Sequence, residues 1–99
     1  MELNIQSLHF TASGQLQSFI EKKCQKLEKF CDTVVKADVI LEVVKPDTSL
    51  NKQARISVAM QGAEAFAEKT CDTFEQAVDE CVEALQKQLI KNKEKQREK

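Results

Sequence analysis

The spacing of apolar residues changes along this chain, and that change constrains its fold more than any other feature. Over residues 15–30 and again over 74–89, apolar side chains recur three and four residues apart, which is typical of amphipathic helices. Over residues 2–10, 34–45, 54–60 and 63–68 they alternate with polar or small residues, which predicts strands. The predicted order is β-α-β-β-β-α.

Short turn signals separate these segments. The run from Thr11 to Gly14 precedes the first helix, a Pro-containing loop begins at Pro46, and Gln61-Gly62 is typical of a tight hairpin. Either Asp72 or Thr73 is placed to cap the last helix. We therefore predict an α+β fold, in which a four-stranded sheet carries two helices packed side by side on one face.

The chain length allows one domain. It has 99 residues with only one Pro and two Gly, so it offers few breaks for a linker. We expect residues 1–95 to form a single domain. Nothing apolar follows about Lys93, so we expect the last helix to fray there and residues 96–99 to form a charged tail.

Composition narrows the class of protein. No apolar run approaches the roughly 18 residues that cross a bilayer, and the N-terminus lacks a secretory signal pattern, so we expect a cytoplasmic protein. The single histidine, His9, and four cysteines without a C-x-x-C pair predict neither a metal site nor another cofactor. We expect the cysteines to be small core residues. The sequence has no Gly-rich loop and no evident pair of carboxylates, so we do not expect an enzyme.

Charge along the last third of the chain falls into two blocks. From Gly62 to Gln86 there are seven acids and one base, whereas from Lys87 to Lys99 there are six bases and two acids. A concentrated basic end can hold a polyanion although the whole chain carries a net charge of only −1. Acids early and bases late also complement a helix macrodipole, so this pattern alone leaves both interpretations open.

Lysines follow one side of each predicted helix. In the first helix, the side opposite the apolar stripe carries Lys22, Lys26 and Lys29, and Lys23 lies at the flank of this row. In the second helix, the corresponding row is Lys87, Lys91 and Lys95. If both helices cover the same sheet face, the two rows can approach one another and form a surface for phosphates. The other sheet face would carry Asp38, Glu42, Glu64 and Glu68, which predicts an electrically two-sided molecule.

Two segments add a family resemblance to the element order. They are Lys23-x-x-Lys26-Leu27-Glu28-x-Phe30-x-Asp32, and Ala77-Val78-Asp79 leading to Leu85-x-Lys87-Gln88-Leu89-x-Lys91-x-Lys93-x-Lys95. With that order, they resemble the bacterial ribosome hibernation-promoting factors, a group that includes the ribosome-associated inhibitor. The likeness covers nearly the whole chain. Because the chain stops at Lys99, it looks like the short form without a C-terminal dimerising domain.

The resemblance implies a function and a set of contacts. It implies binding to the small ribosomal subunit and its rRNA in the channel for mRNA and tRNA, which silences translation in stationary phase or stress, with no membrane or small-molecule substrate. The rRNA-binding residues carried over are Lys23, Lys26, Lys87, Lys91, Lys93 and Lys95. Helix geometry adds Lys22 and Lys29. Ala84 departs from the pattern because relatives often carry a base there, and the nearby Glu80 and Glu83 are acidic.

Two other binding functions remain open from the sequence. One is a small protein-interaction or regulatory domain that acts through the acidic sheet face and not on ribosomes. The other is a double-stranded-RNA-binding module, although such domains begin with a helix and use a basic helix N-terminus. The second helix here begins with acids, at Asp72 and Glu75, where phosphates would dock.

Overall fold

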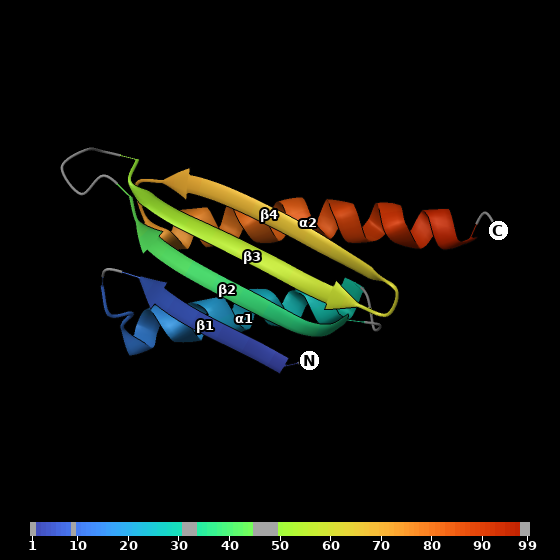
Figure 1. The fold of residues 1–99 in the computed structure, drawn as a ribbon, viewed down its shortest axis with the longest axis horizontal. Coiled ribbons are helices and arrows are strands. Elements are labelled where there is room, and N and C mark those ends of the chain that lie inside the picture. The colour runs from blue at the N-terminus through green and yellow to red at the C-terminus, as the bar shows by residue number, and fades with distance from the viewer. Residues whose placement is uncertain (1, 9, 31–33, 45–49, 98–99) are drawn as a thin grey trace.

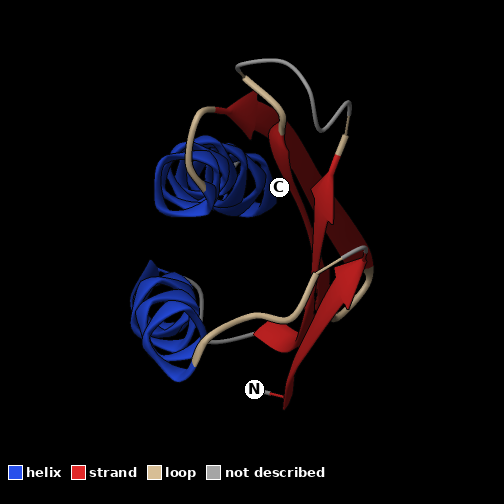
Figure 2. Cartoon of the chain, turned by 90° about the vertical axis from the view of Figure 1, so that its left-hand side faces the viewer, coloured by secondary structure: helices blue, strands red, loops and turns tan. Residues whose placement is uncertain are grey.

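Two helices cover one face of a four-stranded sheet in the computed structural model of this chain, which describes residues 2–8, 10–30, 34–44 and 50–97 (Figures 1 and 2). The elements follow one another as β1 (Glu2–Leu8), α1 (Gly14–Phe30), β2 (Val34–Val43), β3 (Lys52–Met60), β4 (Ala63–Cys71) and α2 (Phe74–Arg97). The predicted fold and element order are confirmed.

The strands lie in their sequence order across the sheet. β1 pairs with β2 in parallel, while β2–β3 and β3–β4 are antiparallel. The parallel pair requires a crossover, which α1 provides. Gly62, at φ 78°, makes the predicted tight turn between β3 and β4, where glycine adopts a positive φ without steric cost.

Side-chain oxygens cap both helices. Ser13 Oγ accepts a hydrogen bond from Leu16 N at 3.1 Å, and Thr73 Oγ1 accepts one from Gln76 N at 3.1 Å. Thr73, not Asp72, therefore caps α2. The Asp72 carboxylate instead accepts a hydrogen bond from the backbone N–H of Leu50, which has a positive φ of 53°.

The core lies between the sheet and the helices. Both apolar stripes predicted from the sequence point into it, and Ile20, Leu27 and Leu85 are fully buried. Small residues of β4, including Ala65 and Ala67, face α2, so this helix can lie close to the sheet. At the end where α2 begins, the rings of Phe10 and Phe74 stack with centroids 4.4 Å apart.

Several element ends differ from the sequence expectations. β1 ends at Leu8 and not at residue 10, and β2 ends at Val43. α2 continues to Arg97, past the expected fraying point near Lys93, because its N–H···O=C bonds propagate along the helix without needing apolar side chains. The last turns of α2 extend beyond the turn that joins β3 and β4 (Figure 1). His9, Cys31 and residues 46–49 of the expected loop lie outside the described residues.

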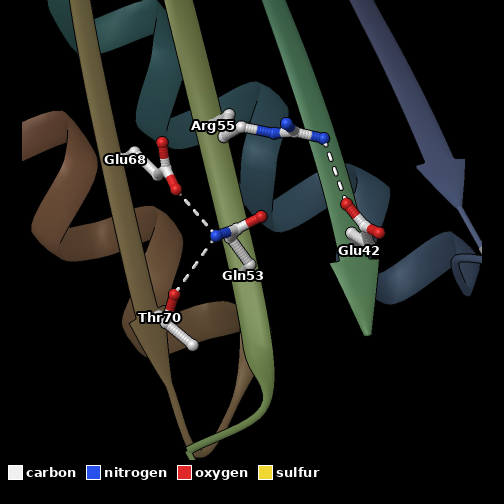
Figure 3. A network of polar contacts seen from close by, with 5 residues as sticks. All are labelled: Glu42, Gln53, Arg55, Glu68 and Thr70. Carbon is white, nitrogen blue, oxygen red and sulfur yellow. Dashed lines mark hydrogen bonds and ion pairs between the residues drawn. The ribbon is translucent and has the colours of Figure 1, made fainter. Parts of the chain in front are cut away.

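No helix of the described residues covers the second sheet face, and we call it the open face (Figure 2). Its side chains form a polar network across β2, β3 and β4 (Figure 3). Arg55 pairs with Glu42 at 3.2 Å, and the Gln53 amide donates to Glu68 at 2.7 Å and to Thr70 at 3.5 Å. The expected acids lie on this face, as the register of the strands shows.

Candidate nucleic-acid interface

The lysines of α1 lie on its outer side. Lys22, Lys26 and Lys29 are exposed, while the fully buried Ile20, Cys24 and Leu27 hold the opposite side against the core. The spacing of three and four residues places the three exposed ammonium groups along one side of the helix. An exposed row of this kind can contact phosphates without any rearrangement of the core.

The charges of α1 divide between its two flanks. Glu21, Gln25 and Glu28 line a shallow cleft of about 300 Å³ against Leu3 and Ile5 of β1. Lys23 and Lys26 lie on the other flank, which faces α2. The positive side of α1 is therefore turned toward its neighbouring helix and the solvent.

A groove of about 250 Å³ separates the two helices. Lys23 and Lys26 line it from α1, and α2 contributes Asp79, Val82, Glu83 and Gln86. Lys23 Nζ lies 2.7 Å from Asp79 Oδ1 and 5.4 Å from the centre of the Phe19 ring, and its side chain is only 24% exposed. Lys23 is thus held in place by two contacts within the molecule.

The lysines of α2 lie on a different flank. Lys87 lines a second cleft, of about 280 Å³, together with Lys69 of β4 and with Glu80 and Ala84 of α2. Lys91 is exposed one turn later. Glu83 lines both the groove and this cleft. The two lysine rows therefore line different clefts, and Glu83, which we call the acidic ridge, borders both. This arrangement favours two separate positive sites over the single surface predicted from the sequence.

Lys93 and Lys95 belong to the last turns of α2, and their side chains lie outside the described part of the structure. All the other candidates lie in the helix layer. Lys23 and Lys26 line the same groove, whereas Lys87 lines a different cleft.

Two residues of this region were missed by sequence analysis. Lys69 shares the cleft with Lys87, and the strand alternation after Ala63, Ala65 and Ala67 already indicated that position 69 points toward the helices. Asp79 is the partner of Lys23, but no local pattern links residues that far apart in sequence.

The described residues show neither a metal-binding cluster nor a membrane-spanning helix. Within them, no three metal-binding side chains gather, and neither helix is long and apolar enough to span a bilayer. What the helix layer offers is a set of exposed ammonium groups on a firm scaffold, which suits electrostatic contact with an anionic surface.

Comparison with known sequences places the chain in a family. Residues 3–97 match the family described as Sigma 54 modulation protein / S30EA ribosomal protein. The ribosome hibernation promoting factor of Azotobacter vinelandii is 30% identical over 96 residues, covering 97% of this chain and 86% of that protein. The protein of the same name from Escherichia coli strain K12 is 27% identical over 95 residues, covering 96% of both.

Solved structures share the fold. A ribosomal subunit interface protein from Coxiella burnetii has a TM-score of 0.84 at 24% identity, covering 94% of this chain and 98% of that chain. The N-terminal domain of Protein Y from Thermus thermophilus has a TM-score of 0.78 at 21% identity, covering 90% and 96%. Since the family match spans all but the ends of the sequence, this chain belongs to the Sigma 54 modulation protein / S30EA ribosomal protein family.

Proposed function

We propose that this protein is a ribosome hibernation factor. It binds the small ribosomal subunit through rRNA, occupies the channel for mRNA and tRNA, and silences translation in stationary phase or stress in the cytoplasm. The observation that carries this proposal is the family match over residues 3–97, together with curated relatives named ribosome hibernation promoting factor. Occupancy of the channel requires no chemistry from the protein.

The helix layer supports this function physically. Lys22, Lys26 and Lys29 on α1 and Lys87 and Lys91 on α2 are exposed, and phosphate contacts are made one ammonium group at a time. The open face carries more acids than bases, so it would repel an RNA backbone. The protein would therefore approach rRNA with its helices.

We assign the rRNA contacts to two groups because Lys26 and Lys87 line different clefts. Lys22, Lys26 and Lys29 form the α1 group, with Lys23 at its edge in a pair with Asp79. Lys87 and Lys91 form the α2 group, and Lys93 and Lys95 extend it along the helix. The acidic ridge at Glu83 would lie between two RNA segments instead of under one.

Cosedimentation with purified small subunits tests the proposal. About five phosphate contacts predict a log–log slope of about −4 for binding affinity against salt concentration. Replacing both Lys87 and Lys91 with Glu should weaken binding about a hundredfold or more, because two charge-assisted contacts are lost and repulsion is added. Circular dichroism should show an unchanged fold, since both side chains are exposed.

A charge-matched control distinguishes the helix layer from overall charge. Lys36→Glu makes the same charge change as Lys87→Glu, but Lys36 lies on the open face, 3.8 Å from Asp38. Lys36→Glu should bind nearly as well as wild type. Absence of wild-type cosedimentation at low salt would refute ribosome binding, and equal losses in the two single variants would refute the assignment to the helices.

A further inference from the structure

The open face has an uneven distribution of charge. By strand register, its side chains form cross-strand rows, in which Lys36 aligns with Ala59 and Glu64, and Asp38 aligns with Ser57 and Phe66. Five acids and two bases of β1–β4 lie on this face, namely Glu2, Asp38, Glu42, Glu64, Glu68, Lys36 and Arg55. The face is therefore negative and suits a positively charged partner.

Phe66 is an exposed aromatic residue about midway along β4, which is an edge strand of the sheet. Its surface is 52% exposed although its strand is well packed on the other side, where Ala65 and Ala67 are buried. The cross-strand partner of Phe66 is the small Ser57, and Ala59 lies opposite Glu64. Because these neighbours are small, the Phe66 ring remains open to a docking side chain.

The two bases of the open face pair with acids of β2 and not with Glu64 or Glu68 of β4. Lys36 lies 3.8 Å from Asp38, and Arg55 turns to Glu42 on β2, although its register partner on β4 is Glu68 (Figure 3). Glu68 accepts a hydrogen bond from the neutral Gln53 amide instead. Within the described residues, neither Glu64 nor Glu68 has a cationic partner, so two carboxylates flank an open ring.

The structure assigns this β4 patch, Glu64–Phe66–Glu68, as a docking site for an extended basic segment of another protein. An arginine guanidinium would lie over the Phe66 ring, and neighbouring basic side chains would pair with Glu64 and Glu68. Side chains two residues apart on a strand are about 7 Å apart, which matches the alternate side chains of an extended peptide better than those of a helix. The carboxylates exclude RNA from the same surface.

The edge of β4 also favours side-chain docking at this point. Gln88 of α2 donates its amide N–H to the backbone oxygen of Phe66 at 2.9 Å. That carbonyl is therefore engaged within the molecule, and a partner strand added at the edge would have to displace it. Docking on the open face leaves this bond intact.

Fluorescence anisotropy with the whole protein tests the site directly. The probe is a labelled peptide in which arginine alternates with serine, at low salt. We expect saturable binding, and at least about tenfold weaker binding by Glu64→Gln/Glu68→Gln. Phe66→Leu should weaken binding several-fold and remove any preference for this peptide over its lysine counterpart, because leucine has no aromatic face.

The matched control is Glu21→Gln/Glu75→Gln. It changes the net charge equally at two exposed positions of the helices and should bind like wild type. No saturable binding by wild type would overturn the proposal, as would an equal loss in this control. Self-association in sedimentation equilibrium that Glu64→Gln/Glu68→Gln abolishes would assign the patch to a second copy and also overturn it. No ribosome enters the experiment, so its outcome is independent of the proposed function.

Discussion

At the scale of single residues, three cysteine side chains are built into the hydrophobic core. Cys24 and Cys81 are fully buried and Cys71 is nearly so. Burial raises the pKa of Cys24 to about 11 and that of Cys81 to about 12. Burial also raises the pKa of Cys71 to about 11, helped by the Glu80 carboxylate 2.6 Å from its sulfur. These thiols act as small apolar residues, as the sequence indicated.

These raised pKa values predict that stability falls in alkali. The folded state keeps the thiols protonated, whereas the unfolded chain releases the protons near pH 9.0. The stabilisation is complete below that pH and is lost as the pH rises toward the folded pKa, at about 1 kcal/mol per pH unit for each thiol. Urea unfolding at about pH 8 and pH 10 should show a smaller loss for Cys81→Ala than for wild type. An identical pH dependence would contradict this.

Lys23 shows how one contact can change the role of a residue. Sequence analysis placed Lys23 at the flank of the exposed lysine row and among the rRNA contacts. In the structure its ammonium lies 2.7 Å from Asp79 and its side chain is only 24% exposed. Partly exposed ion pairs contribute little to stability, roughly 0.2–1 kcal/mol. The main effect of the pair is to hold the Lys23 ammonium at the groove between the helices.

At the scale of elements, the helix caps set where α1 and α2 begin. Thr73 satisfies a backbone N–H at the start of α2, which is the element that carries the acidic ridge and the Lys87 group. The cap fixes the first turn of α2, while packing of the apolar stripe against the sheet sets the rotation of this helix.

Replacing the Thr73 cap should destabilise the protein by about 1 kcal/mol. Thr73→Ala removes the oxygen that accepts the Gln76 N–H, whereas Thr73→Ser keeps it. Urea denaturation should therefore show a lower free energy of unfolding for Thr73→Ala and a value close to wild type for Thr73→Ser. Equal stability of all three proteins would show that the cap contributes nothing.

At the scale of the whole molecule, α2 separates the lysines into two groups. The molecule is elongated, with principal extents of 50 × 22 × 17 Å, and its two helices run along the sheet (Figure 1). Lys26 faces the groove between the helices, and Lys87 faces the cleft between α2 and β4, with Glu83 bordering both. We therefore expect a polyanion to contact two positive sites and not one continuous strip.

This arrangement predicts additive effects on ribosome binding. Lys26→Gln and Lys87→Gln should each weaken cosedimentation, and the factors should multiply in the double variant to within about 0.5 kcal/mol, since the two side chains share no partner. A second double-mutant cycle, with Lys22→Gln and Lys26→Gln, measures the coupling energy between two lysines of the same row for comparison. A coupling energy well above that limit between Lys26 and Lys87 would indicate that both contact the same phosphate group.

Local patterns in the sequence determined the element order, the inward side of each element, and the acids of the open face. They did so because the periods of helix and strand are local properties of the backbone. Only the tertiary structure decided which side chains pair across elements. Lys23 forms an ion pair with Asp79, and Lys69 lines the same cleft as Lys87. Arg55 pairs with Glu42 and not with its register partner Glu68. The physical reason is that the rotation of each helix depends on packing its whole apolar stripe against distant elements, which no local period specifies.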